Sequence, residues 1–164
     1  MTSQFNYWIV TDLDGTLMDH KYDITPALDT LKLLRIKSIP VIPCTSKTAA
    51  EVRYFREEIG LEDSYIVENG AAIYINDSKS SKEKEIILGN SYKDLIKILE
   101  LISVDLDYNL MPLNDLTFSD IESLTGLKNE SIKRAKERKW SVPFLNPPVI
   151  YSDRLKKLSK IYDV

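Results

Sequence analysis

In its first half the chain alternates short apolar runs with segments of helical periodicity. The runs are residues 7–11, 39–44 and 64–67, and their apolar residues are continuous rather than alternating. Such runs are typical of strands that are buried on both faces of a parallel sheet. The segments between them, residues 25–34 and 48–59, are predicted to be helices. This order of strands and helices predicts an α/β fold with a doubly wound parallel sheet.

A polar stretch at residues 76–85 separates this part from the rest of the chain, and we expect it to be an exposed loop. Beyond it, residues 149–151 are predicted to be a strand. The predicted helices are residues 92–102, 119–124, 130–138 and 154–161. We therefore predict two domains. Residues 1–82 form the N-terminal part of an α/β core, and residues 83–164 form a small α+β domain.

The composition is that of a soluble globular protein, since 43% of the 164 residues are hydrophobic and 29% are charged. The net charge of −3 argues against a strongly basic surface for nucleic acid. The single cysteine, Cys44, excludes an internal disulfide and a cysteine-based metal cluster. No run approaches the roughly 18 apolar residues that span a bilayer, and the N-terminus lacks a signal-peptide pattern. We expect a cytoplasmic protein that binds neither nucleic acid nor membrane.

The motif that carries chemistry is the sequence Asp-Leu-Asp-Gly-Thr-Leu at residues 12–17, directly after the first predicted strand. Ligands bind at the carboxyl ends of strands in open α/β sheets. Asp12 and Asp14 are two residues apart and point the same way, and Gly15 allows a sharp turn behind them. With a hard cation such as Mg²⁺ bound, Asp12 can attack phosphorus while Asp14 acts as general acid and base. An isolated Asp-Gly pair would indicate only a turn.

This motif resembles the first motif of the haloacid dehalogenase superfamily. The resemblance implies that Asp12 forms an aspartyl-phosphate, that Asp14 is the acid/base, and that both hold Mg²⁺. The second motif of that family is a Thr or Ser that ends the next core strand. Thr45 lies at that place and would bind a phosphate oxygen, with Ser46 and Lys47 beside it. Taken alone, a threonine after a strand is more often a helix N-cap.

Further segments resemble one branch of this family, the mannosyl-3-phosphoglycerate phosphatases. Residues 44–48 read Cys-Thr-Ser-Lys-Thr, where many relatives that act on sugar phosphates read Thr-Gly-Arg. Residues 67–74, 118–127 and 135–144 are also similar to that branch. The resemblance implies a C2-type α+β cap and hydrolysis of a small phosphorylated sugar–glycerate. A general sugar-phosphate phosphatase or a phosphohexomutase with the same cap is the alternative.

Two positions in the cap segment bear on the substrate. Arg138 matches a basic residue of the branch and would face the carboxylate or phosphate of the substrate. A solvated helix residue is the competing interpretation. Val142 stands where the branch usually carries a glutamate, so a carboxylate that could meet sugar hydroxyls is missing.

The resemblance also implies two later motifs, a lysine that follows the cap and an acidic Gly-Asp-x-x-x-Asp segment that completes the metal site. No acidic segment of that form occurs after residue 85. We therefore expect a chain truncated before the third and fourth motifs, with little activity by itself. Pairing as a homodimer, a separate C-terminal polypeptide, or a non-catalytic remnant that binds a ligand or partner all remain open at this point.

Overall fold

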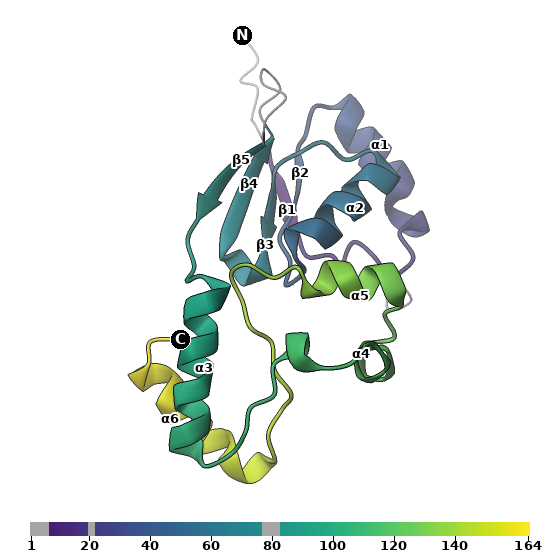
Figure 1. Cartoon of the computed structure of the whole chain (residues 1–164). Helices are drawn as coiled ribbons and strands as arrows, with labels where there is room; N and C mark the ends of the chain where they lie inside the picture. The colour runs from purple at the N-terminus through teal and green to yellow at the C-terminus, as the bar shows by residue number, and fades with distance from the viewer. Residues whose placement is uncertain (1–6, 20–21, 77–82) are drawn as a thin grey trace. The chain divides into compact units, whose positions relative to one another are not determined.

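The computed structural model describes residues 7–19, 22–76 and 83–164, and it divides into two compact units between Gly89 and Asn90. Figure 1 shows the succession of strands and helices in each unit. The elements of the first unit are β1 (Ile9–Thr11), α1 (Leu28–Ile36), β2 (Val41–Pro43), α2 (Ala49–Ile59), β3 (Tyr65–Val67), β4 (Ala72–Asn76) and β5 (Glu83–Ile87).

Three parallel strands form the part of the sheet that carries the motif. β1 pairs in parallel with β2, with Thr11 opposite Pro43. A parallel bridge between Cys44 and Ile66 joins the end of β2 to β3. The chain thus moves in one direction through β1, β2 and β3, and right-handed crossovers then place both connecting helices on the same face. Figure 1 shows α1 and α2 together on that face, and the predicted α/β class is confirmed.

Helix α2 begins after a threonine and ends before a glycine, residue types that are favoured at these two positions. Thr48 Oγ1 accepts a hydrogen bond from the Glu51 N–H, and the Thr48 N–H donates to Glu51 Oε2 at 2.9 Å. This reciprocal capping box satisfies two amides of the first turn. Gly60 ends α2 in the left-handed conformation at φ +66°, where a residue with a Cβ is disfavoured. Val52, on the face toward the sheet, is fully buried.

The division between the two units falls after Gly89, not near residue 82. The reason is that β5 pairs antiparallel with β4 along residues 83–87, which makes it the outer strand of the first unit. The ends of the predicted loop at residues 76–85 therefore belong to strands, and residues 77–82 lie outside the described part. The charged sequence of β5 hides its strand character. Glu83 pairs with two arginines and Glu85 accepts a hydrogen bond from a tyrosine, so neither depends on an apolar core.

The second unit is built from helices, and its β-pairing is limited to a bridge between Pro112 and Phe144. Its helices are α3 (Tyr92–Leu106), α4 (Phe118–Thr125), α5 (Asn129–Lys136) and α6 (Ser152–Ile161). α3 packs on α6 around a buried cluster of Leu99, Ile102, Leu106, Leu110 and Leu158. The strand predicted at residues 149–151 is wrong. This segment is a 3-10 turn, begun by a hydrogen bond from the Tyr151 N–H to the Pro148 carbonyl, that leads into α6.

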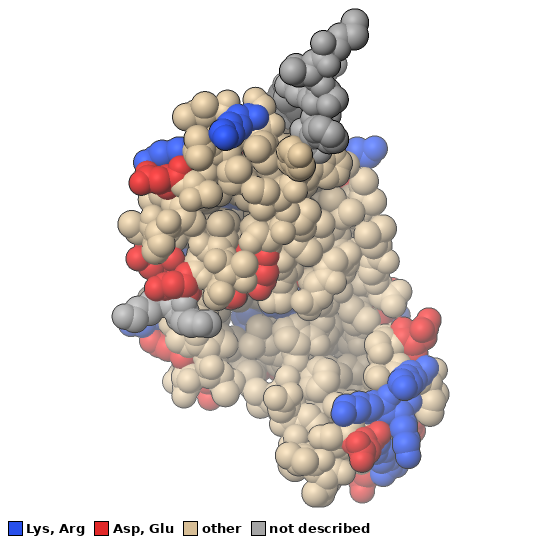
Figure 2. Space-filling view, turned by 180° about the vertical axis from the view of Figure 1, so that it is seen from behind, with Lys and Arg blue, Asp and Glu red and all other residues tan. Residues whose placement is uncertain are grey.

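On the face drawn in Figure 2, basic side chains lie among acidic ones and form no large basic field. Among residues 7–19, 22–76 and 83–164, none of the helices is both long and apolar enough to traverse a bilayer.

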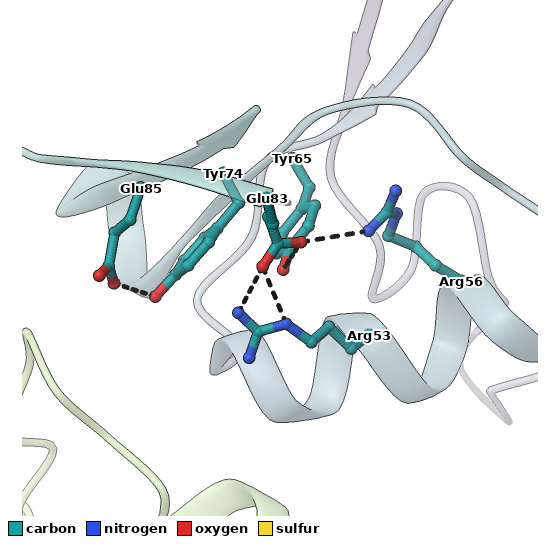
Figure 3. Close-up of polar contacts among 6 residues, drawn as sticks. All are labelled: Arg53, Arg56, Tyr65, Tyr74, Glu83 and Glu85. Carbon is teal, nitrogen blue, oxygen red and sulfur yellow. Dashed lines mark hydrogen bonds and ion pairs between the residues drawn. The ribbon is translucent and has the colours of Figure 1, made fainter. Parts of the chain in front are cut away.

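A stacked pair of tyrosines joins α2 to the strands of the first unit (Figure 3). The rings of Tyr65 and Tyr74, which are opposite each other on β3 and β4, lie 5.0 Å apart and nearly parallel. The guanidinium of Arg56 lies 4.5 Å from the centre of the Tyr65 ring, and that of Arg53 lies 4.9 Å from the Tyr74 ring. Cation–π contacts thus flank both rings, and these four side chains bind the helix to the sheet.

Glu83 from β5 is the anion at the centre of this cluster. It accepts two hydrogen bonds from Arg53, at 2.5 and 3.1 Å, and one from the Tyr65 hydroxyl at 2.7 Å. Arg56 Nη1 lies 3.8 Å from the same carboxylate. Burial, and then the hydrogen bond to Glu83, raises the pKa of Tyr65 well above its usual value, so its hydroxyl remains a donor at neutral pH.

Replacing Glu83 by glutamine is expected to lower the free energy of unfolding by about 2–3 kcal/mol, because the buried Arg56 then loses its anion. This loss of unfolding free energy is smaller than the loss expected for a fully buried ion pair, because the Glu83 side chain is 25% exposed. Glu85→Gln is the matched control. Glu85 also accepts a hydrogen bond from a tyrosine, Tyr74. Urea unfolding at neutral pH measures both variants, and equal losses for the two would show that the arginines do not depend on Glu83.

Candidate active site

The first segment of the site is the turn that follows β1. Leu13 is fully buried, whereas Asp12 and Asp14 on either side of it are exposed. The turn is closed by hydrogen bonds from the Leu17 N–H to the Asp12 carbonyl and from the Met18 N–H to the Leu13 carbonyl. Gly15 lies in the left-handed region at φ +71°. Both aspartates of the motif thus lie on the turn that directly follows β1.

The second segment is the end of β2, which lies between β1 and β3. The Cys44 N–H donates to the Thr11 carbonyl at 2.8 Å, and the Thr45 N–H donates to the Ile66 carbonyl at 3.1 Å. Thr45 is buried, at 4% exposure, and its Oγ1 accepts a hydrogen bond from the Lys47 N–H. Thr45 thus begins the turn between β2 and α2, and the N-cap of α2 is Thr48. Ser46 is exposed on this turn.

An ion pair joins the two segments. Lys47 Nζ lies 2.9 Å from Asp14 Oδ2, and the Lys47 side chain is only 15% exposed. The structure therefore brings the lysine of the Thr-Ser-Lys sequence to the second aspartate of the first motif. This contact joins two of the residues that the sequence singles out, and it lies at the carboxyl ends of two paired parallel strands.

A third segment, after β3, supports the turn that holds Thr45 and Lys47, and this contact between the two segments does not follow from the sequence. The Glu68 N–H donates to the Lys47 carbonyl at 3.0 Å, and the Asn69 N–H donates to the Thr45 carbonyl at 3.1 Å. Glu68 is 3% exposed, and both residues have positive φ, at +50° and +61°. Two consecutive left-handed residues are unusual outside glycine and often occur at functional sites. The Asn-Gly pair at residues 69–70 is the signal in the sequence, since both residue types favour turns and Asn tolerates the left-handed conformation.

Arg138 belongs to the second unit. Its Nη1 donates to Ser141 Oγ at 2.9 Å, and the side chain is half-buried just after α5. It is therefore a packed residue rather than a fully solvated one. Val142 packs against the cluster between α3 and α6, so its apolar side chain has a place in that core.

Oxygen donors of the kind that Mg²⁺ prefers are present at the turn after β1. They are the exposed carboxylate of Asp12 and the backbone carbonyl of Asp14, whose own carboxylate pairs with Lys47. Within the described ranges there is no group of three or more His, Cys, Asp or Glu side chains that could hold a metal ion. Mg²⁺ usually takes one or two carboxylates and keeps waters or phosphate oxygens as its other ligands, so this donor set fits it.

The sequence matches the family model of the haloacid dehalogenase-like hydrolases over residues 9–161, so the chain belongs to this family. Two curated relatives are glucosyl-3-phosphoglycerate/mannosyl-3-phosphoglycerate phosphatases. The one from Persephonella marina is 34% identical over 147 residues, which are 84% of this chain and 54% of the relative. The one from Methanococcoides burtonii is 37% identical over 147 residues, 83% of this chain and 54% of the relative.

The chain thus spans about half the length of these relatives. A solved structure shows the same fold. It is a phosphatase of the haloalkanoate (HAD) enzyme superfamily from Bacteroides thetaiotaomicron, with a TM-score of 0.65 at 16% identity. The match covers 96% of this chain and 62% of that one.

Proposed function

We propose that the turn after β1 is the active site of a Mg²⁺-dependent phosphomonoester hydrolase that works through an aspartyl-phosphate. The observation that carries the proposal is the contact between Lys47 and Asp14 at the ends of β1 and β2. It gathers a nucleophile, an acid/base and a cation for phosphate on one edge of the sheet, which is the arrangement that phosphoryl transfer requires.

In this proposal Asp12 is the nucleophile, and Asp14 acts first as the general acid and then as the general base. A carboxylate oxygen of Asp12 forms a bond to phosphorus as the bond from phosphorus to the leaving oxygen breaks, and Asp14 gives that oxygen a proton. Asp14 then takes a proton from the water that attacks the phosphorus of the aspartyl-phosphate, which releases inorganic phosphate and restores Asp12. Bound Mg²⁺ would reduce the repulsion between Asp12 and the phosphate.

The phosphate oxygens are bound from the turn after β2. Thr45 Oγ1 accepts a hydrogen bond from the Lys47 N–H, and its hydroxyl hydrogen would donate to a phosphate oxygen. Lys47 contributes positive charge close by, and Ser46 offers a second hydroxyl on the same turn. In the second unit, Arg138 would bind the carboxylate of the substrate.

We infer that the substrate is mannosyl-3-phosphoglycerate and the product mannosylglycerate. The inference is supported by the names of the two curated relatives and by the resemblance of residues 44–48 to that branch. Turnover should therefore be at least about tenfold faster, as kcat/KM, for mannosyl-3-phosphoglycerate than for glucose 6-phosphate or mannose 6-phosphate. A tenfold difference corresponds to about 1.4 kcal/mol, within what a few polar contacts supply. Equal turnover of all three would favour a general sugar-phosphate phosphatase.

We further propose that a separate C-terminal polypeptide or a second copy of the chain covers β1. Among the described residues only β2 pairs with β1, and Trp8 and Val10 are 70% and 57% exposed. No residue of α1 is buried, and its Ile36 is 81% exposed. A parallel strand usually has both faces covered, and a free edge invites a further strand.

A further inference from the structure

We propose that Tyr22 is a positioning residue that holds the Lys47 ammonium where it can bind a phosphate oxygen. This inference rests on the proposed function of the site and adds a residue that the family motifs do not contain. The centre of the Tyr22 ring lies 5.3 Å from Lys47 Nζ, a distance typical of a cation–π contact. Lys47 is thus held by two different loops, by Asp14 through charge and by Tyr22 through its ring.

The burial of Lys47 shows that the side chain is restricted. Lysine side chains are usually exposed, but this one is only 15% exposed and its ammonium stays between the two partners. A lysine bound only to Asp14 could rotate away with its partner or into solvent. A phosphate that binds in the site competes with Asp14 for the Lys47 ammonium. Because the ring of Tyr22 still holds the ammonium, Lys47 can exchange the carboxylate for the phosphate without leaving the site.

Hydrogen bonds join Tyr22 and Asp23 to Asp19. The Tyr22 N–H donates to the Asp19 carbonyl at 3.0 Å, and the Asp23 N–H donates to Asp19 Oδ1 at 2.9 Å. Asp19 in turn donates its N–H to the Asp23 carbonyl. Tyr22 itself has φ +63°, a left-handed conformation that is uncommon for a bulky residue. Strain of this kind is typically retained where the side chain has a task.

Two substitutions separate the ring from the rest of the residue. Tyr22→Phe keeps the aromatic face, whereas Tyr22→Ala removes it and keeps the same backbone penalty, because alanine is also disfavoured at positive φ. Unfolding of both variants in urea checks that the fold is unchanged. The chain is labelled by reductive ¹³C-methylation of its lysines, and the Lys47 signal is identified by its loss in Lys47→Arg.

We expect the Lys47 methyl signal to be shifted upfield by the Tyr22 ring in the wild-type chain and in Tyr22→Phe, and to move to the range of exposed lysines in Tyr22→Ala. In the presence of Mg²⁺, inorganic phosphate should bind to Tyr22→Ala about threefold to fivefold more weakly than to the wild type. Its affinity for Tyr22→Phe should equal its affinity for the wild type. A Lys47 signal that is the same in Tyr22→Ala would overturn the inference, as would an unchanged affinity for phosphate.

The same experiment separates the existence of the phosphate site from the role of Tyr22. If the wild-type chain binds no phosphate, the proposed phosphate site is wrong and the role of Tyr22 in anion binding fails with it. If phosphate binds and displaces the Lys47 signal, the site stands, and the comparison of Tyr22→Ala with Tyr22→Phe alone decides whether the ring positions the lysine.

Discussion

A polypeptide of residues 1–164 by itself is expected to hydrolyse mannosyl-3-phosphoglycerate about 10⁴-fold or more slowly than a completed protein. The described site holds two carboxylates and Lys47, whereas the family resemblance implies a further lysine and a further acidic segment. One positioned electrostatic group is typically worth about 10²–10³ in rate, so two such groups account for about 10⁴ or more.

The completed protein can be made as a chimaera in which this chain replaces the matching segment of the Persephonella marina phosphatase. The two segments are 34% identical over 147 residues, and the chain covers 54% of that relative. Sedimentation at micromolar concentration should show self-association of the isolated chain through β1 and none in the chimaera. An isolated chain that remains monomeric and turns over at about 1 s⁻¹ or faster, within the ordinary range of enzymes, would contradict this prediction.

Replacing Asp12 by asparagine is expected to lower kcat of the chimaera by about 10⁴-fold or more. An amide oxygen cannot form the covalent phosphoenzyme, and removing a nucleophile typically costs several orders of magnitude. Asp12 is exposed at the end of β1, so the substitution should leave stability within about 0.5 kcal/mol.

The matched control is Asp29→Asn. Asp29 is an exposed aspartate of α1 that pairs with the exposed Lys32, so its loss should change neither rate nor fold. A chimaera with Asp12→Asn that keeps a tenth or more of the wild-type kcat would exclude Asp12 as the nucleophile. Loss of activity together with loss of the folded state would instead trace the effect to the fold.

The sequence predicts the part of the site that depends on the parallel pairing of the strands. Asp12 and Thr45 each follow a continuous apolar run, and the carboxyl ends of adjacent parallel strands meet at one edge of a sheet. The position of Lys47 near Asp14 follows from the same argument. A pattern of apolar runs thus places the residues of both turns without any knowledge of long-range contacts.

The strand β5 and the role of Tyr22 depend on contacts between distant residues, which no local sequence pattern predicts. β5 reads as a charged loop, and it is a strand because Glu83 meets Arg53 and Arg56 from a helix some 30 residues earlier. Tyr22 reads as an ordinary loop residue in the sequence, but its ring contacts Lys47 and its backbone is left-handed. Positive φ at a non-glycine residue has no reliable signal in the sequence.

The central claim is that Asp12 carries the phosphoryl group, and trapping that group tests it most directly. The chimaera is mixed with mannosyl-3-phosphoglycerate and Mg²⁺, quenched in acid within one turnover, digested and analysed by mass spectrometry. We expect one added phosphoryl group on the peptide that contains Asp12, in the wild type and in Asp29→Asn, and none in Asp12→Asn. Full release of phosphate with no phosphoryl group on that peptide at any quench time, or with the group on another residue, would contradict the account.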